Sequence, residues 1–210
     1  MIGWFARYDP DDHLAEPARD CAAWLTGQSS FEHSSLSPGQ MALLDDVAGL
    51  GYNPVRSGFP YNSALLAVPY RKEPVIGASV RNAAQFAAAR TSRRFAEDLA
   101  RHLQPLLDHT SRRLLLLCGS CGAELFTAAL PHLRVPAGLR VLVVALGPVG
   151  RLPDEDARVK VRVVRGTRDW LSRAVSRVPE QHLVPGGHLD YVKLPQVRAV
   201  VLSVGREFLR

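Results

Sequence analysis

The sequence predicts an α/β fold, in which a predominantly parallel central sheet is flanked by helices. Three continuous apolar runs, at 114–117, 139–146 and 159–164, are typical of strands that are buried on both faces of a parallel sheet. Segments with helical periodicity lie between apolar runs, so strands and helices alternate. The chain has 210 residues, 47% of them hydrophobic, which predicts a single domain over 1–210 with a full hydrophobic core.

Apolar spacing and turn residues predict the order of elements in the amino-terminal half. They are a short strand at 2–7, a helix at 11–26, a loop at 27–39, a helix at 41–50 closed by Gly51, a strand at 52–56, a turn-rich loop at 57–62 and an irregular segment at 63–79. The helix at 11–26 depends on Leu14, Ala18 and Cys21, which a helix would place on one face.

The carboxyl-terminal half shows a clearer alternation of helices and strands. Its predicted elements are a long helix at 80–107, a strand at 114–117, a helix at 123–133, strands at 139–146 and 159–164, a short strand at 181–184 and a helix at 197–209. The connection at 147–158 is too short for a cap domain. Active sites of open α/β sheets lie beyond the carboxyl ends of the strands, so the loops that follow these strands are where a site is expected.

Charge and cysteine content exclude several classes of protein. The net charge is +6, and 23 arginines and three lysines are scattered along the chain among 20 acidic residues, unlike the clustered basic surface of a nucleic-acid binder. Three cysteines do not form a disulfide framework. The start of the chain lacks the pattern of a signal peptide, and no apolar run is long enough to span a membrane. A cytoplasmic protein that does not bind nucleic acid and does not span a membrane is expected.

The loop after the apolar run at 114–117 carries a candidate nucleophile. It is Cys118-Gly119-Ser120-Cys121-Gly122, and a predicted helix follows at once. A strand, a tight turn centred on serine and an immediate helix form the context of a nucleophile elbow. Small residues are needed two positions before and after the serine because the turn is sharp. Cys118 occupies a place where glycine is usual in G-x-S-x-G.

Three other interpretations of this turn stay open. Cys121 is the nucleophile if the frame moves by one residue. Cys118 and Cys121 are a C-x-x-C redox pair in the second alternative. In the third, the segment is an ordinary strand-to-helix turn without catalytic function.

Two later motifs favour the serine. Gly166-Thr167-Arg168-Asp169 follows the apolar run at 159–164, and a Gly-His pair at 187–188 follows the last predicted strand. The chain resembles the α/β-hydrolase family over about 40–210, in these two motifs and in the order Ser, Asp, His. The resemblance implies a catalytic triad of Ser120, Asp169 and His188. His182, Asp154, Asp156 and Asp190 are the weaker alternatives for the base and the acid.

The resemblance also implies an oxyanion hole and suggests substrate contacts. The backbone amide of Cys121, directly after the nucleophile, would supply one donor. Ser57-Gly58-Phe59-Pro60 is similar to the family's H-G-x-P loop; because Pro60 has no N–H, Phe59 is expected to supply the second donor, with Gly58 as the alternative. Because no cap domain is expected, the segment at 63–79 with Tyr70, together with the preceding Tyr61, is expected to be either a partial wall for the substrate or a solvated loop.

These residues together predict hydrolysis of an ester or thioester through an acyl-enzyme on Ser120. The substrate would be a small acyl compound, either free or attached to a carrier protein or to coenzyme A. No cofactor and no metal ion are expected. Two alternatives belong to other classes: a non-hydrolytic relative that binds a ligand or catalyses cyclisation, and a thiol redox protein that uses Cys118 and Cys121.

Overall fold

The structure, a computed structural model, describes residues 5, 7–66, 68–176, 178 and 181–210. Within these residues an all-parallel sheet of six strands has the order β2-β1-β3-β4-β5-β6. The predicted α/β fold with a parallel sheet is therefore confirmed. The strands are β1 Ala18–Leu25, β2 Asn53–Gly58, β3 Thr110–Gly119, β4 Arg140–Leu146, β5 Val159–Gly166 and β6 His182–Val184.

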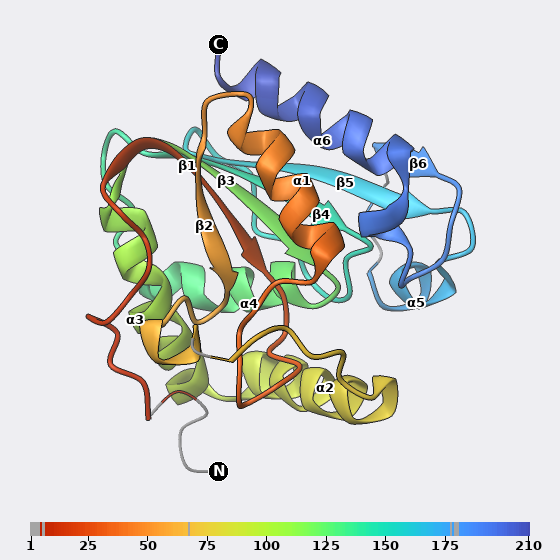
Figure 1. Ribbon diagram of the computed structural model, residues 1–210, viewed down its shortest axis with the longest axis horizontal. Coiled ribbons are helices and arrows are strands. Elements are labelled where there is room, and N and C mark those ends of the chain that lie inside the picture. Colours follow the sequence, from red (N-terminus) through yellow and green to blue (C-terminus); the bar gives the residue numbers. More distant parts are fainter. Residues whose placement is uncertain (1–4, 6, 67, 177, 179–180) are drawn as a thin grey trace.

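Helices cover both faces of the sheet (Figure 1). On one face lie α1 Pro38–Ala48 and α6 Pro195–Phe208, and on the other α2 Val75–Thr91, α3 Arg93–Asp108 and α4 Gly122–Ala129. The short α5 Trp170–Val175 lies beside the β6 end of the sheet. In the part of the chain that the structure describes, three 3₁₀ segments complete the elements: η1 Ser63–Leu65, η2 Leu130–His132 and η3 Tyr191–Lys193.

The continuous apolar runs arise because both sheet faces are buried. Side chains alternate between the faces of a strand, so Leu114 and Leu116 of β3 pack with the α2, α3 and α4 side. Leu115 and Leu117 pack with the α1 and α6 side. All four leucines are fully buried. The central strand therefore needs apolar residues at successive positions, which is the pattern from which the sheet was predicted.

The helix predicted at 11–26 is wrong, because the second half of this segment forms the strand β1. Cys21 to Leu25 is a continuous apolar run, all of it buried, and it lies between β2 and β3. A run of this length fits the apolar face of a helix as well as a buried strand, so periodicity alone does not separate them. The wrong helix matters for the candidate site, because β1 pairs with β3 and Ser120 directly follows β3.

Local signals explain other differences from the predicted boundaries. The single helix predicted at 80–107 is two helices, α2 and α3, and α2 begins inside the segment predicted to be irregular. The break is at Ser92, which is extended and whose hydroxyl caps α3 by accepting from the Phe95 amide at 3.2 Å. A similar cap begins α1, where Ser37 and Gln40 form a capping box and Pro38 is the first helical residue.

The remaining predicted elements occur with shifted ends. The predicted helices at 41–50, 123–133 and 197–209 correspond to α1, α4 with η2, and α6, and the predicted strands from 52 onward correspond to β2 to β6. The predicted strand at 2–7 lies mostly outside the described residues, and Phe5 and Arg7 are in turns. The helix α5 was not predicted. No helix in the described part of the chain is long and apolar enough to cross a bilayer.

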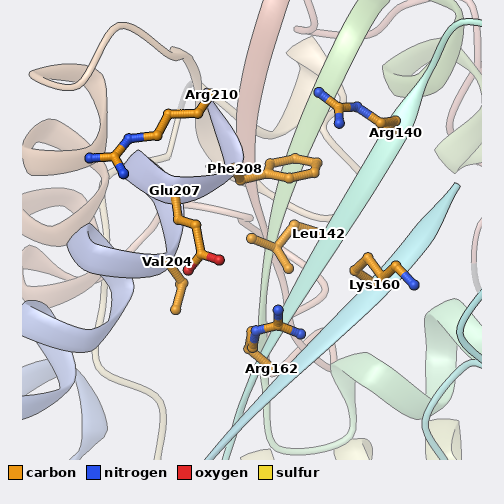
Figure 2. A pocket seen from close by; sticks show the side chains of 8 residues that line it. All are labelled: Arg140, Leu142, Lys160, Arg162, Val204, Glu207, Phe208 and Arg210. Atoms are coloured by element: carbon orange, nitrogen blue, oxygen red, sulfur yellow. The ribbon is translucent and has the colours of Figure 1, made fainter. Parts of the chain in front are cut away.

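A shallow cavity of about 150 Å³ opens at the amino-terminal ends of β4 and β5, under the end of α6 (Figure 2). Strand residues Arg140 and Lys160 and the helix residue Phe208 are among those that line it. The guanidinium of Arg140 lies over the Phe208 ring, 5.6 Å from its centroid. The cavity is therefore at the end of the sheet opposite to the loops in which the candidate triad was predicted.

Candidate active site

The turn after β3 holds Ser120 in an uncommon backbone conformation. Its φ is 51°, in the left-handed region that costs energy for a residue other than glycine. Hydrogen bonds on both sides fix the turn: the Ser120 amide donates to the Leu146 carbonyl at 3.2 Å, and the Val149 amide donates to the Ser120 carbonyl at 2.9 Å. Strained, well-supported residues of this kind cluster at functional sites.

Small residues around Ser120 are required by the end of β1. A Cβ atom on Gly122 would lie 1.9 Å from the carbonyl oxygen of Leu25, and one on Gly119 would lie 3.1 Å from Cγ2 of Thr26. Only glycine therefore fits at the start of α4 without displacing the backbone. Cys118, where G-x-S-x-G has glycine, is fully buried in the core on the α2 to α4 side, so its side chain is accommodated.

His188 lies within hydrogen-bond distance of both other residues predicted as a triad. The Ser120 hydroxyl oxygen is 3.0 Å from Nε2 of His188, and Nδ1 of His188 is 3.1 Å and 3.0 Å from the two carboxylate oxygens of Asp169. Asp169 follows β5 and His188 follows β6. Since parallel strands end at one edge of the sheet, residues 49 and 68 positions after Ser120 reach the same place.

The surroundings of Asp169 favour its ionised form. Burial of this carboxyl would raise its pKa, but hydrogen bonds from His188, the Tyr191 hydroxyl and the Ser172 amide outweigh burial and hold its pKa below the usual range. The amide of Ser172 donates to Oδ1 at 2.9 Å and the Tyr191 hydroxyl donates to Oδ2 at 2.6 Å. Asp169 is thus a fixed acceptor for the imidazole.

Candidate backbone donors for an oxyanion lie in the turn at Ser120 and in the loop next to it. Cys121 is the N-cap residue of α4, so its amide precedes the hydrogen bonds of the helix. The loop after β1 touches this turn, since a Cβ atom on Gly27 would lie 2.8 Å from the Cys121 sulfur. Thr26-Gly27 directly follows the apolar run of β1, and this pattern could have indicated a loop at the site. It was missed because 11–26 was predicted to be a helix.

Phe59, predicted as the second oxyanion donor, follows β2 and not β1. β1 lies between β2 and β3, the strand that precedes Ser120. The ring of Phe59 is buried in the core, with ring centroids 5.1 Å from Phe5 and 5.7 Å from Tyr61. The alternative, Gly58, donates its amide to the Ser34 carbonyl at 2.7 Å. The position of β1 favours its own loop as the source of the second donor.

The two tyrosines predicted to contact substrate lie in different environments. Tyr61 is only 1% exposed, and its hydroxyl donates to the Trp24 carbonyl at 2.8 Å. Its side chain therefore belongs to the core and is not part of a surface wall. Tyr70 is exposed, and its ring meets that of His33 edge-on at 6.1 Å between centroids.

The cysteines of the turn are buried, and burial disfavours their thiolate forms. Burial raises the pKa of the Cys121 thiol to about 11, and it raises the pKa of Cys118 further. A thiol with a raised pKa has little thiolate at neutral pH, and thiolate is the nucleophilic and redox-active form. This environment does not favour Cys121 as the nucleophile or the two cysteines as a redox pair. In the part of the chain that the structure describes, no three His, Cys, Asp or Glu side chains gather as metal ligands.

Comparison with known proteins bears on the fold. No family model and no curated protein matches the chain. Among solved structures, a dienelactone hydrolase-like promiscuous phosphotriesterase from metagenomic libraries aligns with a TM-score of 0.54 and 14% identity, over 96% of this chain and 95% of that one. The protein has the α/β-hydrolase fold.

Two further solved structures align less closely. They are a dienelactone hydrolase from Anabaena variabilis (TM-score 0.48, 14% identity, 93% of this chain and 88% of that one) and a carboxylesterase from Mesorhizobium loti (TM-score 0.41, 18% identity, 93% and 90%). The connection at 147–158, between β4 and β5, contains no helix or strand. The sequence analysis expects this connection to be too short for a cap domain.

The buried thiols lead to the first prediction. In the native protein Cys21, Cys118 and Cys121, all free and buried, should react with 5,5′-dithiobis(2-nitrobenzoic acid) at neutral pH far more slowly than after unfolding in guanidinium chloride. The absorbance change of the released thiolate measures both rates. A rapid native reaction of Cys118 or Cys121 would support the redox interpretation instead.

Proposed function

We propose that the chain is a serine hydrolase that cleaves an ester or thioester through an acyl-enzyme on Ser120. One observation carries this proposal: Ser120, His188 and Asp169 form a continuous hydrogen-bonded relay with heavy-atom distances of 3.0 Å at each step. A serine hydroxyl becomes a useful nucleophile when an adjacent base accepts its proton and a third group orients that base. The α/β-hydrolase fold is consistent with this chemistry but does not by itself determine it.

The relay assigns a role to each side chain. Oγ of Ser120 attacks the acyl carbonyl carbon while Nε2 of His188 accepts the hydroxyl proton, and the imidazolium then protonates the leaving alcohol or thiol. Asp169, hydrogen-bonded to Nδ1, keeps the imidazole in the tautomer that has Nε2 free and stabilises the imidazolium. Water attacks the acyl-enzyme with the same base, and this releases the acid and restores Ser120.

Negative charge on the tetrahedral intermediate needs preorganised donors. The Cys121 amide supplies one, and we propose that an amide of the loop after β1 supplies the other, because this loop packs against Cys121 and Gly122. The amino-terminal end of α4 adds a favourable partial charge at the same place.

The surface next to the relay favours a substrate with an apolar acyl group. Trp170, which follows Asp169, is 75% exposed, and Leu189, which follows His188, is 68% exposed. We propose that these two side chains contact the acyl group of the substrate. With no cap over 147–158, the rest of a substrate can stay outside the protein, as it would for an acyl group carried by coenzyme A or a carrier protein.

Replacing the nucleophile tests the proposal. Ser120→Ala should lower kcat for p-nitrophenyl esters or acyl thioesters by at least about a thousandfold, because the acyl-enzyme no longer forms. Circular dichroism should show an unchanged fold. Cys121→Ala is the matched control in the same turn: it keeps the backbone amide, so it should retain most of the activity. Wild-type turnover in Ser120→Ala with loss in Cys121→Ala would assign the nucleophile to the cysteine.

The acid has its own test. Asp169→Asn should lower kcat by about ten-thousandfold, the loss recorded for the corresponding change in the well-studied triad, because the amide favours the wrong imidazole tautomer. Asp190→Asn is the control, since Asp190 accepts the Gly187 amide at 2.8 Å and is not in the relay. Steady-state hydrolysis measures both. A larger loss in Asp190→Asn than in Asp169→Asn would contradict the assignment.

A further inference from the structure

We propose that Tyr191 is a positioning residue, whose hydroxyl holds Asp169 in the orientation that His188 requires. The proposal rests on the proposed triad and adds to it a residue that the sequence motifs do not identify. Tyr191 begins η3, three positions after His188, and is 6% exposed. It is thus a buried phenol on the loop that carries the base.

The Tyr191 hydroxyl connects the Asp169 carboxylate to the end of β5 through two hydrogen bonds. Its oxygen accepts a hydrogen bond from the amide of Gly166, the last residue of β5, at 2.8 Å, and lies 2.6 Å from Oδ2 of Asp169. The amide can only donate, so the single phenolic hydrogen is left for the carboxylate. Hydrogen bonds to an ionised acceptor are short and strong, and this one fixes Oδ2 relative to the sheet.

Two donors on opposite oxygens restrict rotation of the carboxylate. Tyr191 donates to Oδ2 and the Ser172 amide donates to Oδ1. With both oxygens held, the carboxylate group cannot turn about its χ2 bond without losing a buried hydrogen bond, and that loss is costly. Nδ1 of His188 then meets the two oxygens at nearly equal distances, 3.1 and 3.0 Å.

The loop after β4 encloses this pair. Gly147 has a φ of +56°, and a Cβ atom there would lie 2.4 Å from Cε2 of Tyr191 and 2.6 Å from Oδ2 of Asp169. The glycine therefore lets the backbone close over the ring and the carboxylate together. Since the Gly147 amide also donates to the Val164 carbonyl of β5 at 2.9 Å, the ring is packed between two fixed strand ends.

Charge keeps Tyr191 a donor over the working pH range. Burial raises the pKa of its hydroxyl, and the hydrogen bond to the negative Asp169 raises it further, which outweighs the lowering effects of the Gly166 amide and of Arg165. The groups that face Asp169 are His188 from the β6 loop, Tyr191 from η3 and the Ser172 amide from α5. Arg165 acts on the tyrosine from β5 and is itself bonded to the Ser172 hydroxyl and the Ser176 carbonyl.

The test compares Tyr191→Phe with Tyr52→Phe in ester hydrolysis. Tyr52 is the matched control: it is also buried, and its hydroxyl donates to the Gly205 carbonyl at 2.8 Å, between α6 and the sheet. Tyr191→Phe should lower kcat by roughly tenfold to a hundredfold, the scale expected for a misplaced catalytic group, with KM within about twofold. Tyr52→Phe should leave kcat and KM unchanged, whatever its effect on the melting temperature.

Two further readouts separate positioning from general stability. A carboxylate that loses one donor keeps more negative charge with which to stabilise the imidazolium, so the pH below which kcat/KM declines through protonation of the base should move upward in Tyr191→Phe and stay in place in Tyr52→Phe. When Asp169→Asn is already present, adding Tyr191→Phe should lower kcat little further, because the tyrosine acts through the carboxylate.

The proposal is overturned if Tyr191→Phe has the same kcat and KM as Tyr52→Phe, or if it raises KM and leaves kcat unchanged. It is also overturned if Tyr191→Phe lowers kcat by the full factor when Asp169→Asn is already present. Ser120→Ala measured in the same assay distinguishes this failure from that of the proposed function. An inactive Ser120→Ala with a fully active Tyr191→Phe removes only the role of Tyr191. Full turnover in Ser120→Ala removes the triad itself.

Discussion

The structure of the site depends on one tight contact, between the start of α4 and the end of β1. The carbonyl oxygen of Leu25 occupies the space that a side chain at Gly122 would need. This contact lets the chain reverse from β3 into α4 within two residues. Ser120 is then left in the left-handed region with its hydroxyl beyond the carboxyl edge of the sheet. Hydrogen bonds of its amide and carbonyl to Leu146 and Val149 hold it there.

The parallel sheet then determines which other side chains can meet Ser120. β4 pairs with β3, the strand that precedes Ser120, and with β5. β6 pairs with the other edge of β5. The loops after β5 and β6 therefore bring Asp169 and His188 to the same edge, where the imidazole spans the distance between acid and serine. The cationic cavity at the other end of β4 and β5 takes no part in this arrangement (Figure 2).

Sequence reasoning worked where one physical cause dominates a segment. Both-face burial produces the apolar runs of β3, β4 and β5, so the fold could be predicted. A sharp turn before a helix demands small residues, which indicated Ser120, and the family resemblance indicated Asp169 and His188. The structure brings these three side chains together, and their catalytic roles stay a prediction. Sequence reasoning failed for β1, because an apolar run of five residues fits a helix and a strand equally well. The expected oxyanion loop at Phe59 came from a likeness to the H-G-x-P loop, and without β1 in the predicted sheet the loop at Thr26-Gly27 was not considered. The role proposed for Tyr191 depends on three loops that are distant in sequence, and no local pattern shows it.

Covalent trapping of the nucleophile tests the central claim most directly. The protein is treated with a fluorophosphonate, which reacts with a serine that an adjacent base activates, and the modified residue is located by fragmentation of the peptide that contains Ser120 and Cys121. A single adduct on Ser120 should form rapidly in the wild type and far more slowly in His188→Ala. An adduct on another residue, or an equal labelling rate in His188→Ala, would contradict the proposed triad.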